Sequence, residues 1–229
     1  MIARHLSVTR TARYYLSREP GPEIRELWIA LHGHGQLARA FAKQCAVIEA
    51  PHRLVAVPEA LNRYYIGDPA VQQTTQSVAK MGATWMTRED REAEIADYVG
   101  YLDVLHADLR NGLAAAGAAE DVALHVLGFS QGVSTALRWI SLGSLGTHRP
   151  ARAILWAGSV PPELTAEQLR AATAGVRTTL VAGTRDEFAT AERVAAIEKI
   201  LSDANVEFDT RRFDGGHRLD DAMLQELST

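Results

Sequence analysis

The sequence has a single cysteine, Cys45, in 229 residues. One thiol cannot form an internal disulfide, so the fold does not depend on an oxidising compartment. We expect Cys45 to be a small core residue on a predicted helix. Lysine is scarce, no cluster of Lys and Arg is present, and the formal net charge is −4. Nucleic acids and anionic membranes recruit proteins through basic patches, so the sequence predicts neither of them as a partner.

Long apolar segments are also missing. No uninterrupted apolar stretch reaches the ~18 residues that a transmembrane helix needs, and the first residues lack the apolar run of a secretory signal. We therefore expect a cytoplasmic protein. Hydrophobic residues make up 47% and charged residues 23%, which is typical of a globular domain with a sizeable core. No repeat or change in composition divides the chain, so we expect one domain over residues 1–229.

Short apolar segments alternate with helical patterns along most of the chain. Apolar runs of strand length predict buried strands, and segments of helical periodicity follow most of them. The predicted strands are 27–31, 54–57, 122–127, 153–156, 178–182 and 206–213, with one or two edge strands over 6–17. The predicted helices are 37–48, 88–117, one from 131, 166–173, 189–203 and one from about 219. This alternation predicts an α/β fold with a mostly parallel central sheet and helices on both faces.

Residues 58–88 show only weak periodicity and contain four large side chains, Tyr64, Tyr65, Trp85 and Met86. A loop of this length usually has a function, so the segment is a candidate lid or pocket loop. The four side chains could line a substrate pocket. Ordinary packing in the core or in the loop explains each of them equally well.

The strongest signal lies at residues 128–132, which read Gly-Phe-Ser-Gln-Gly between a predicted strand and a predicted helix. A serine hydroxyl is a poor nucleophile unless it is exposed beside a base. A tight strand-to-helix turn lifts the hydroxyl of Ser130 above the sheet edge, and the flanking glycines leave room for the strained backbone. A glycine-rich turn without chemical meaning is the alternative, which this placement disfavours. We therefore predict that Ser130 is the nucleophile of an α/β-hydrolase elbow.

The base should lie after the last strand, because α/β hydrolases order their triad as serine, acid and histidine. Beyond Ser130 the sequence has two histidines, His148 and His217. His148 precedes the strand predicted at 153–156, which is the wrong place for the base. His217 follows a glycine-containing turn after the last predicted strand. The pattern therefore predicts His217 as the base, in preference to an ordinary histidine of a surface loop.

The acid should follow a strand between the nucleophile and the base. Asp186 comes just after the strand predicted at 178–182, at the strand end where ligands bind in open α/β sheets. There its carboxylate can accept the imidazole N–H and fix the tautomer. Glu187 and Asp214 are alternative acids, and a helix N-cap is the competing role for Asp186.

An oxyanion hole needs two backbone N–H groups that point at the developing negative charge. One should come from Gln131, directly after the nucleophile, and the other from the loop at residues 32–36, where we predict the N–H of His34. His32 and His34 also form a His-x-His pair of the kind that can bind a metal. Two ligands are too few without a third, and no carboxylate follows in the segment, so we expect no metal site.

The chain resembles the phospholipase/carboxylesterase family of α/β hydrolases, which includes acyl-protein thioesterases and small bacterial carboxylesterases. The resemblance covers nearly the whole length and is carried by five motifs. These are residues 31–36 (Leu-His-Gly-His-Gly-Gln), 58–60 (Pro-Glu-Ala), 128–132, 183–186 (Gly-Thr-Arg-Asp) and 215–217 (Gly-Gly-His). The glutamine after the nucleophile is typical of this family. The resemblance implies the α/β-hydrolase fold and hydrolysis of carboxylic esters or thioesters without a cofactor.

By position, the resemblance gives each expected site residue a role. It implies a triad of Ser130, Asp186 and His217, oxyanion donors at His34 and Gln131, and an aromatic after the lid-like loop at Trp85. Three departures from the family pattern surround the expected pocket and affect the expected substrate rather than the chemistry. Gln36 replaces the usual Asp of the oxyanion loop, 187–189 (Glu-Phe-Ala) replaces a Val-Pro pair, and 86–90 replaces an aromatic-Asp pair.

We therefore predict a serine carboxylesterase that acts on small to medium carboxylic esters. An acyl thioesterase or a lysophospholipase would use the same residues and differ in pocket length. A non-catalytic binding protein on a hydrolase fold is a further alternative. It is disfavoured because all three triad residues are present in the expected order.

Overall fold

The computed structural model describes residues 1–67 and 80–229, and within them a seven-stranded sheet forms the centre of the molecule. Its strand order is β1-β3-β2-β6-β7-β8-β9. The strands are β1 (Tyr14–Leu16), β2 (Glu26–Leu31), β3 (Arg53–Pro58), β6 (Ala123–Phe129), β7 (Pro150–Trp156), β8 (Arg177–Gly183) and β9 (Phe208–Phe213). Only β1 pairs antiparallel to its neighbour; the other neighbouring strands of this sheet are parallel. The predicted α/β architecture is confirmed.

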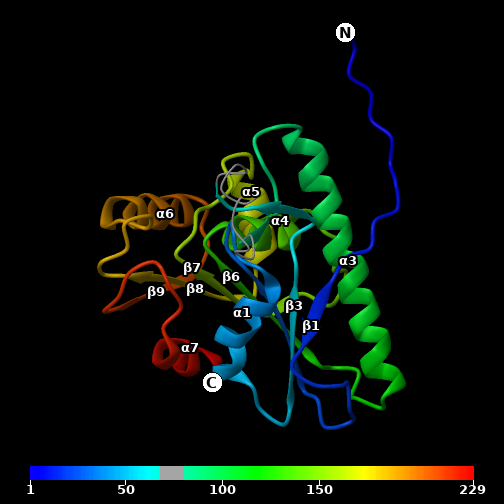
Figure 1. The fold of residues 1–229 in the computed structure, drawn as a ribbon. Helices are drawn as coiled ribbons and strands as arrows, with labels where there is room; N and C mark the ends of the chain where they lie inside the picture. The colour runs from blue at the N-terminus through cyan, green and yellow to red at the C-terminus, as the bar shows by residue number, and fades with distance from the viewer. Residues whose placement is uncertain (68–79) are drawn as a thin grey trace.

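The helices form two groups on opposite faces of the sheet (Figure 1). They are α1 (Ala38–Cys45), the short 3₁₀ helix η1 (Ala46–Ile48), α3 (Arg91–Ala115), α4 (Gln131–Leu142), α5 (Ala166–Thr173), α6 (Ala191–Asp203) and α7 (Asp221–Ser228). Helices α3, α4, α5 and α6 pack on one another in that order, whereas α1 packs on β3 and α7 on η1. In the described part of the chain no helix has both the length and the apolar character needed to cross a membrane.

Two segments differ from the sequence prediction. The edge strand expected over 6–17 is shortened to β1, because Tyr14 pairs with Pro58, the last residue of β3, and residues before Tyr14 have no strand to pair with. They form an extended arm that runs away from the sheet (Figure 1).

The predicted structureless loop at 58–88 contains a hairpin of β4 (Asn62–Tyr65) and β5 (Met81–Thr84), which pair antiparallel. Residues 68–79 of the expected lid lie outside the described residues. Strands of four residues are too short to give a clear periodicity. The hairpin can approach the loop after β2 closely because Gly82 of β5 has no side chain. A Cβ at Gly82 would lie 2.7 Å from the carbonyl oxygen of Gly35.

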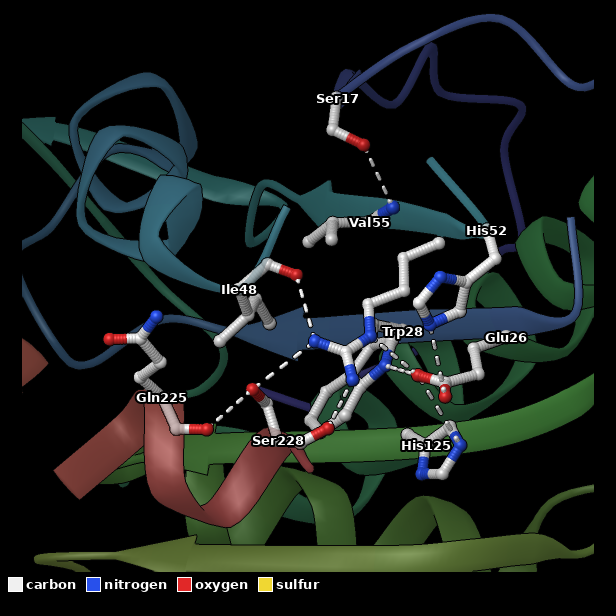
Figure 2. Close-up of polar contacts among 10 residues, drawn as sticks. Ser17, Glu26, Trp28, Ile48, His52, Val55, His125, Gln225 and Ser228 are labelled. Carbon is white, nitrogen blue, oxygen red and sulfur yellow. Dashed lines mark hydrogen bonds and ion pairs between the residues drawn. The ribbon is translucent and has the colours of Figure 1, made fainter. Parts of the chain in front are cut away.

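A cluster of polar side chains around Arg53 lies at the N-terminal ends of β2 and β3 (Figure 2). The Arg53 guanidinium donates to Glu26 at 2.7 Å, to the carbonyl oxygen of Ile48 at 3.3 Å and to the carbonyl oxygen of Ser228. The Glu26 carboxylate also accepts from the Trp28 indole at 2.9 Å. Burial alone would raise the pKa of Glu26, but the hydrogen bonds from Trp28 and Arg53 outweigh it and lower that pKa. Arg53 therefore joins β2, β3, η1 and α7.

Two buried histidines make the stability of the fold depend on pH. His125 is stacked on Trp28 with 4.7 Å between ring centroids, and His106 packs edge-on against Trp139. Burial lowers the pKa of each imidazole to about 4. An unfolded histidine gains its proton near pH ~6.5. Between those values the unfolded chain binds more protons than the folded one, so the free energy of unfolding falls as the pH drops from about 6.5 to about 4.

We expect the urea midpoint to fall over that range, and the fall to be smaller in His125→Gln and His106→Gln, because glutamine does not titrate. Urea denaturation at pH 7, 6, 5 and 4 measures this. Carboxylates add their own dependence at the acid end, so the comparison of each variant with the wild type carries the test. An unchanged pH slope in both variants would contradict the assignment.

Candidate active site

Ser130 lies in a tight turn between β6 and α4. Its φ of 55° and ψ of −117° place it in a strained region that non-glycine residues rarely adopt. Two glycines allow the turn: a Cβ at Gly128 would lie 2.5 Å from the carbonyl oxygen of Gly132, and a Cβ at Gly132 would overlap the carbonyl oxygen of Leu31. The Ser130 N–H donates to the carbonyl oxygen of Trp156 at 2.8 Å. The strain is therefore held by packing against β2 and β7.

The structure brings Ser130, His217 and Asp186 into one hydrogen-bonded chain. His217 Nε2 lies 2.9 Å from Ser130 Oγ, and His217 Nδ1 lies 2.9 Å from Asp186 Oδ2. The second carboxylate oxygen, Asp186 Oδ1, accepts from the N–H groups of Phe188 at 2.8 Å and Ala189 at 2.7 Å. The Asp186 side chain has no exposed surface. Its carboxylate therefore has three hydrogen-bond partners and a fixed orientation behind the imidazole.

The two alternative acids, Asp214 and Glu187, are exposed to solvent. The Asp214 side chain is 77% exposed and forms an ion pair with Arg185 at 2.5 Å. Glu187 is exposed to solvent. Helix α6 is capped by Thr190, whose side chain accepts from the Arg193 N–H, so Asp186 is not its N-cap.

The loop after β2 lies against the elbow, as an oxyanion hole requires. A Cβ at Gly33 would lie 3.1 Å from Ser130 Cβ. The loop is held by Gln36, whose side-chain oxygen accepts from the Gly33 N–H at 2.8 Å. In this way Gln36 can fill the place of the aspartate expected from the resemblance. Within the described residues, the backbone N–H groups of His34 and Gln131 donate to no protein acceptor. Both are free for a substrate oxygen.

A model of the serine hydrolase (FSH1) family matches residues 28–220, which is most of the chain and includes all of these positions. The chain belongs to this family of serine hydrolases. No curated protein sequence matches the chain.

Solved structures support the fold of the hydrolase at low sequence identity. Acyl-protein thioesterase 2 of Zea mays superposes with a TM-score of 0.64 at 18% identity, over 95% of this chain and 96% of that chain. A carboxylesterase from Mesorhizobium loti gives a TM-score of 0.65 at 22% identity, over 94% and 93%. The carboxylesterase of Bacillus cereus gives 0.64 at 13% identity, over 95% and 92%. The fold is therefore that of α/β hydrolases.

His32 of the hydrolase is a buried structural residue. Its Nδ1 lies 2.8 Å from the Gly33 carbonyl oxygen, and its Nε2 accepts from the Ala60 N–H at 3.1 Å. This pattern assigns the proton to Nδ1, and burial lowers the pKa of the ring, which keeps it neutral. Both ring nitrogens are engaged, so His32 offers no free nitrogen to a metal ion. In the part of the chain that the structure describes, no three His, Cys, Asp or Glu side chains are grouped as metal ligands.

The four candidate pocket residues of the hydrolase have different positions. Trp85 is 1% exposed, and its indole N–H donates to the carbonyl oxygen of His32 at 2.9 Å, which corresponds to a core anchor rather than a pocket wall. Met86 is half-buried and Tyr65 is exposed. The Tyr64 hydroxyl lies 2.8 Å from His34 Nε2, so Tyr64 contacts the oxyanion loop.

Two further residues, Phe188 and Thr84, contact the predicted site residues without being indicated by the sequence. Phe188 is 64% exposed, and its ring centroid lies 4.8 Å from that of His217. Its position two residues after the acid, in a loop, was the available signal. Thr84 is buried, its Oγ1 lies 3.1 Å from His34 Nδ1, and it has no sequence motif around it. Its contacts with the site are to His34 and Gln131, which are distant from it in sequence.

Proposed function

We propose that this serine hydrolase is a carboxylesterase that hydrolyses small to medium carboxylic esters. The observation that carries the proposal is the chain of hydrogen bonds from Asp186 through His217 to Ser130, with Ser130 on a strained elbow. The two free N–H groups beside it supply the oxyanion hole, and no step needs a cofactor.

In the first half of the reaction His217 Nε2 accepts the proton of Ser130, and Oγ attacks the ester carbonyl carbon. The N–H groups of His34 and Gln131 stabilise the negative oxygen of the tetrahedral intermediate. Asp186 holds Nδ1 protonated and stabilises the imidazolium. The intermediate then collapses to an acyl-enzyme, and His217 gives its proton to the departing alcohol.

In the second half a water molecule replaces the alcohol. His217 takes a proton from this water, which attacks the acyl carbon of the ester on Ser130. The same two N–H groups hold the second oxyanion. Collapse releases the carboxylic acid, and the proton on His217 returns to Ser130.

An apolar substrate group beside the base is supported by Phe188, whose exposed ring lies against the His217 imidazole. A second candidate function is acyl thioester hydrolysis. It is supported by the structural likeness to a protein named acyl-protein thioesterase, and a lysophospholipase would use the same residues. The single-domain organisation, the cytoplasmic location and the absence of nucleic-acid partners stay predictions.

The experiment that tests this function is labelling with a fluorophosphonate, which reacts with activated serines. We expect one label per chain, found at Ser130 by peptide mass spectrometry, and no label in Ser130→Ala. Ser134→Ala is a matched control one helical turn away and should label as the wild type does. Labelling and esterase activity that persist in Ser130→Ala would overturn the proposal.

A substrate panel separates the candidate activities. It contains p-nitrophenyl esters of increasing acyl length and one acyl thioester, with kcat/KM measured for each. A maximum at short or medium esters supports the carboxylesterase, and a higher value for the thioester supports the second function. Labelling without turnover of any substrate in the panel would contradict both.

A further inference from the structure

A buried hydroxyl lies between the two segments that supply the oxyanion hole. Thr84 ends β5 and is 3% exposed. Its Oγ1 lies 3.1 Å from His34 Nδ1 in the loop after β2, and 2.9 Å from Gln131 Nε2 at the start of α4. We propose that Thr84 is a positioning residue that sets the spacing of the two oxyanion-hole N–H groups. This inference rests on the proposed function.

The Gln131 side chain is fixed at several points to the end of β5. Its Nε2 donates to Thr84 Oγ1 and to the carbonyl oxygen of Met86 at 3.0 Å. Its Oε1 accepts from the Trp85 N–H at 3.1 Å. The carboxamide of Gln131 therefore has partners on both its nitrogen and its oxygen. These bonds hold the first residue of α4, whose own N–H donates to no acceptor among the described residues.

The protons in this network can be assigned so that each donor has an acceptor. Thr84 has one hydroxyl proton, which the Met86 carbonyl oxygen accepts at 2.9 Å. The Thr84 oxygen then accepts from Gln131 Nε2 and from His34 Nδ1–H. His34 Nε2 is left as an acceptor for the Tyr64 hydroxyl at 2.8 Å. A consistent chain thus runs from Tyr64 through His34 and Thr84 to Gln131.

The need for such a tie follows from where the two N–H groups originate. The neighbouring strands β2 and β6 pair as far as Leu31 and Gly128, and both His34 and Gln131 lie beyond that last pair, so strand pairing alone does not fix the positions of their N–H groups. The His34 side chain is exposed, and its bonds to Thr84 and Tyr64 are what hold its orientation. An oxyanion hole works because its donors are already in place when the charge forms. A shift of one donor would reduce the stabilisation of the transition state and leave the affinity for the substrate nearly unchanged.

The test compares Thr84→Val with Thr84→Ser on an activated ester. Valine keeps the shape and removes the hydroxyl, whereas serine keeps the hydroxyl. Loss of a whole oxyanion donor costs about 10²–10³ in kcat. We expect a smaller loss, roughly tenfold or more, for Thr84→Val, with KM within about twofold, because both N–H donors remain but are less well placed. Thr84→Ser should keep kcat within about threefold of the wild type.

A second readout separates positioning from general stability. Boronic acids form a tetrahedral adduct with the active-site serine, so their inhibition constant should rise in Thr84→Val in parallel with the loss in kcat. Gln131→Met keeps the backbone N–H and removes the carboxamide, and it should show the same pattern. This second variant carries the test if Thr84→Val does not fold.

The outcomes are distinguishable. Unchanged kcat and boronate inhibition in folded Thr84→Val and Gln131→Met would overturn the positioning role. An equal loss in Thr84→Val and Thr84→Ser, with a matching fall in thermal midpoint, would show a purely structural role and overturn it too. A wild-type chain that is not labelled at Ser130 would instead overturn the proposed function.

Discussion

Asp186→Asn is expected to lower kcat by about 10⁴, the loss that the same change produces in a serine protease. The reason lies in the two sides of the carboxylate. Asp186 Oδ1 accepts from two backbone N–H groups, so the oxygen of an asparagine must stay on that side. The asparagine NH₂ then faces His217 Nδ1, which can only accept from it. The imidazole is thereby forced to carry its proton on Nε2, and it can no longer accept the proton of Ser130.

The matched control is Asp214→Asn, which removes an acid in the same region of the chain without touching the imidazole. Asp214 is exposed and paired with Arg185, so we expect a loss of about tenfold or less, and the same for Glu187→Gln. All three variants are compared by kcat on one activated ester, with thermal melting as the check on folding. If Asp214→Asn is as damaging as Asp186→Asn while both remain folded, the acid is assigned wrongly.

Gly132→Ala is expected to destabilise the protein and to abolish most of its activity. The added methyl would overlap the carbonyl oxygen of Leu31 and lie 3.0 Å from that of His32. Both are backbone atoms at the start of the oxyanion loop, so relief of the overlap moves the loop away from Ser130. Overpacking costs about 1–3 kcal/mol and sometimes more. We expect a cost at the upper end of that range, because backbone rather than side chains must yield.

Gly100→Ala is the control for this substitution. Gly100 lies inside α3, and a Cβ there would meet nothing within 4 Å. Alanine in a helix interior is favoured over glycine by roughly 0.5–1 kcal/mol. Urea denaturation should therefore show opposite changes in the free energy of unfolding for the two variants, and full activity in Gly100→Ala. Equal stability of Gly132→Ala and the wild type would show that the elbow tolerates a Cβ.

The features that the sequence predicts well are those determined by neighbouring residues. Ser130 could be identified because a strained strand-to-helix turn needs glycines at fixed offsets, and residues 128–132 supply them. Apolar runs of buried strands such as β6 are likewise local signals. The place of Asp186 at a strand end favours it over Asp214, and in the structure the Asp186 carboxylate hydrogen-bonds His217 Nδ1.

The remaining features depend on contacts between distant parts of the chain. The β4–β5 hairpin has no strong apolar pattern, and it packs through the close approach of Gly82 to Gly35. Thr84 and Gln131 are 47 residues apart in sequence, so no motif could join them. Trp85 could line a pocket or anchor the core by sequence alone, and only its burial decides between the two.

The Arg53 cluster also has a consequence for the order of folding. The Arg53 guanidinium donates to the Ser228 hydroxyl across 175 residues of sequence, and the other bonds of the cluster join β2, β3 and η1. During synthesis, β2 and β3 leave the ribosome long before α7 exists. Until then this buried arginine lacks the partner that completes its hydrogen bonds. Contacts of such long sequence separation form slowly, so we expect the hydrogen bonds at the N-terminal ends of β2 and β3 to be completed only after α7 has been translated.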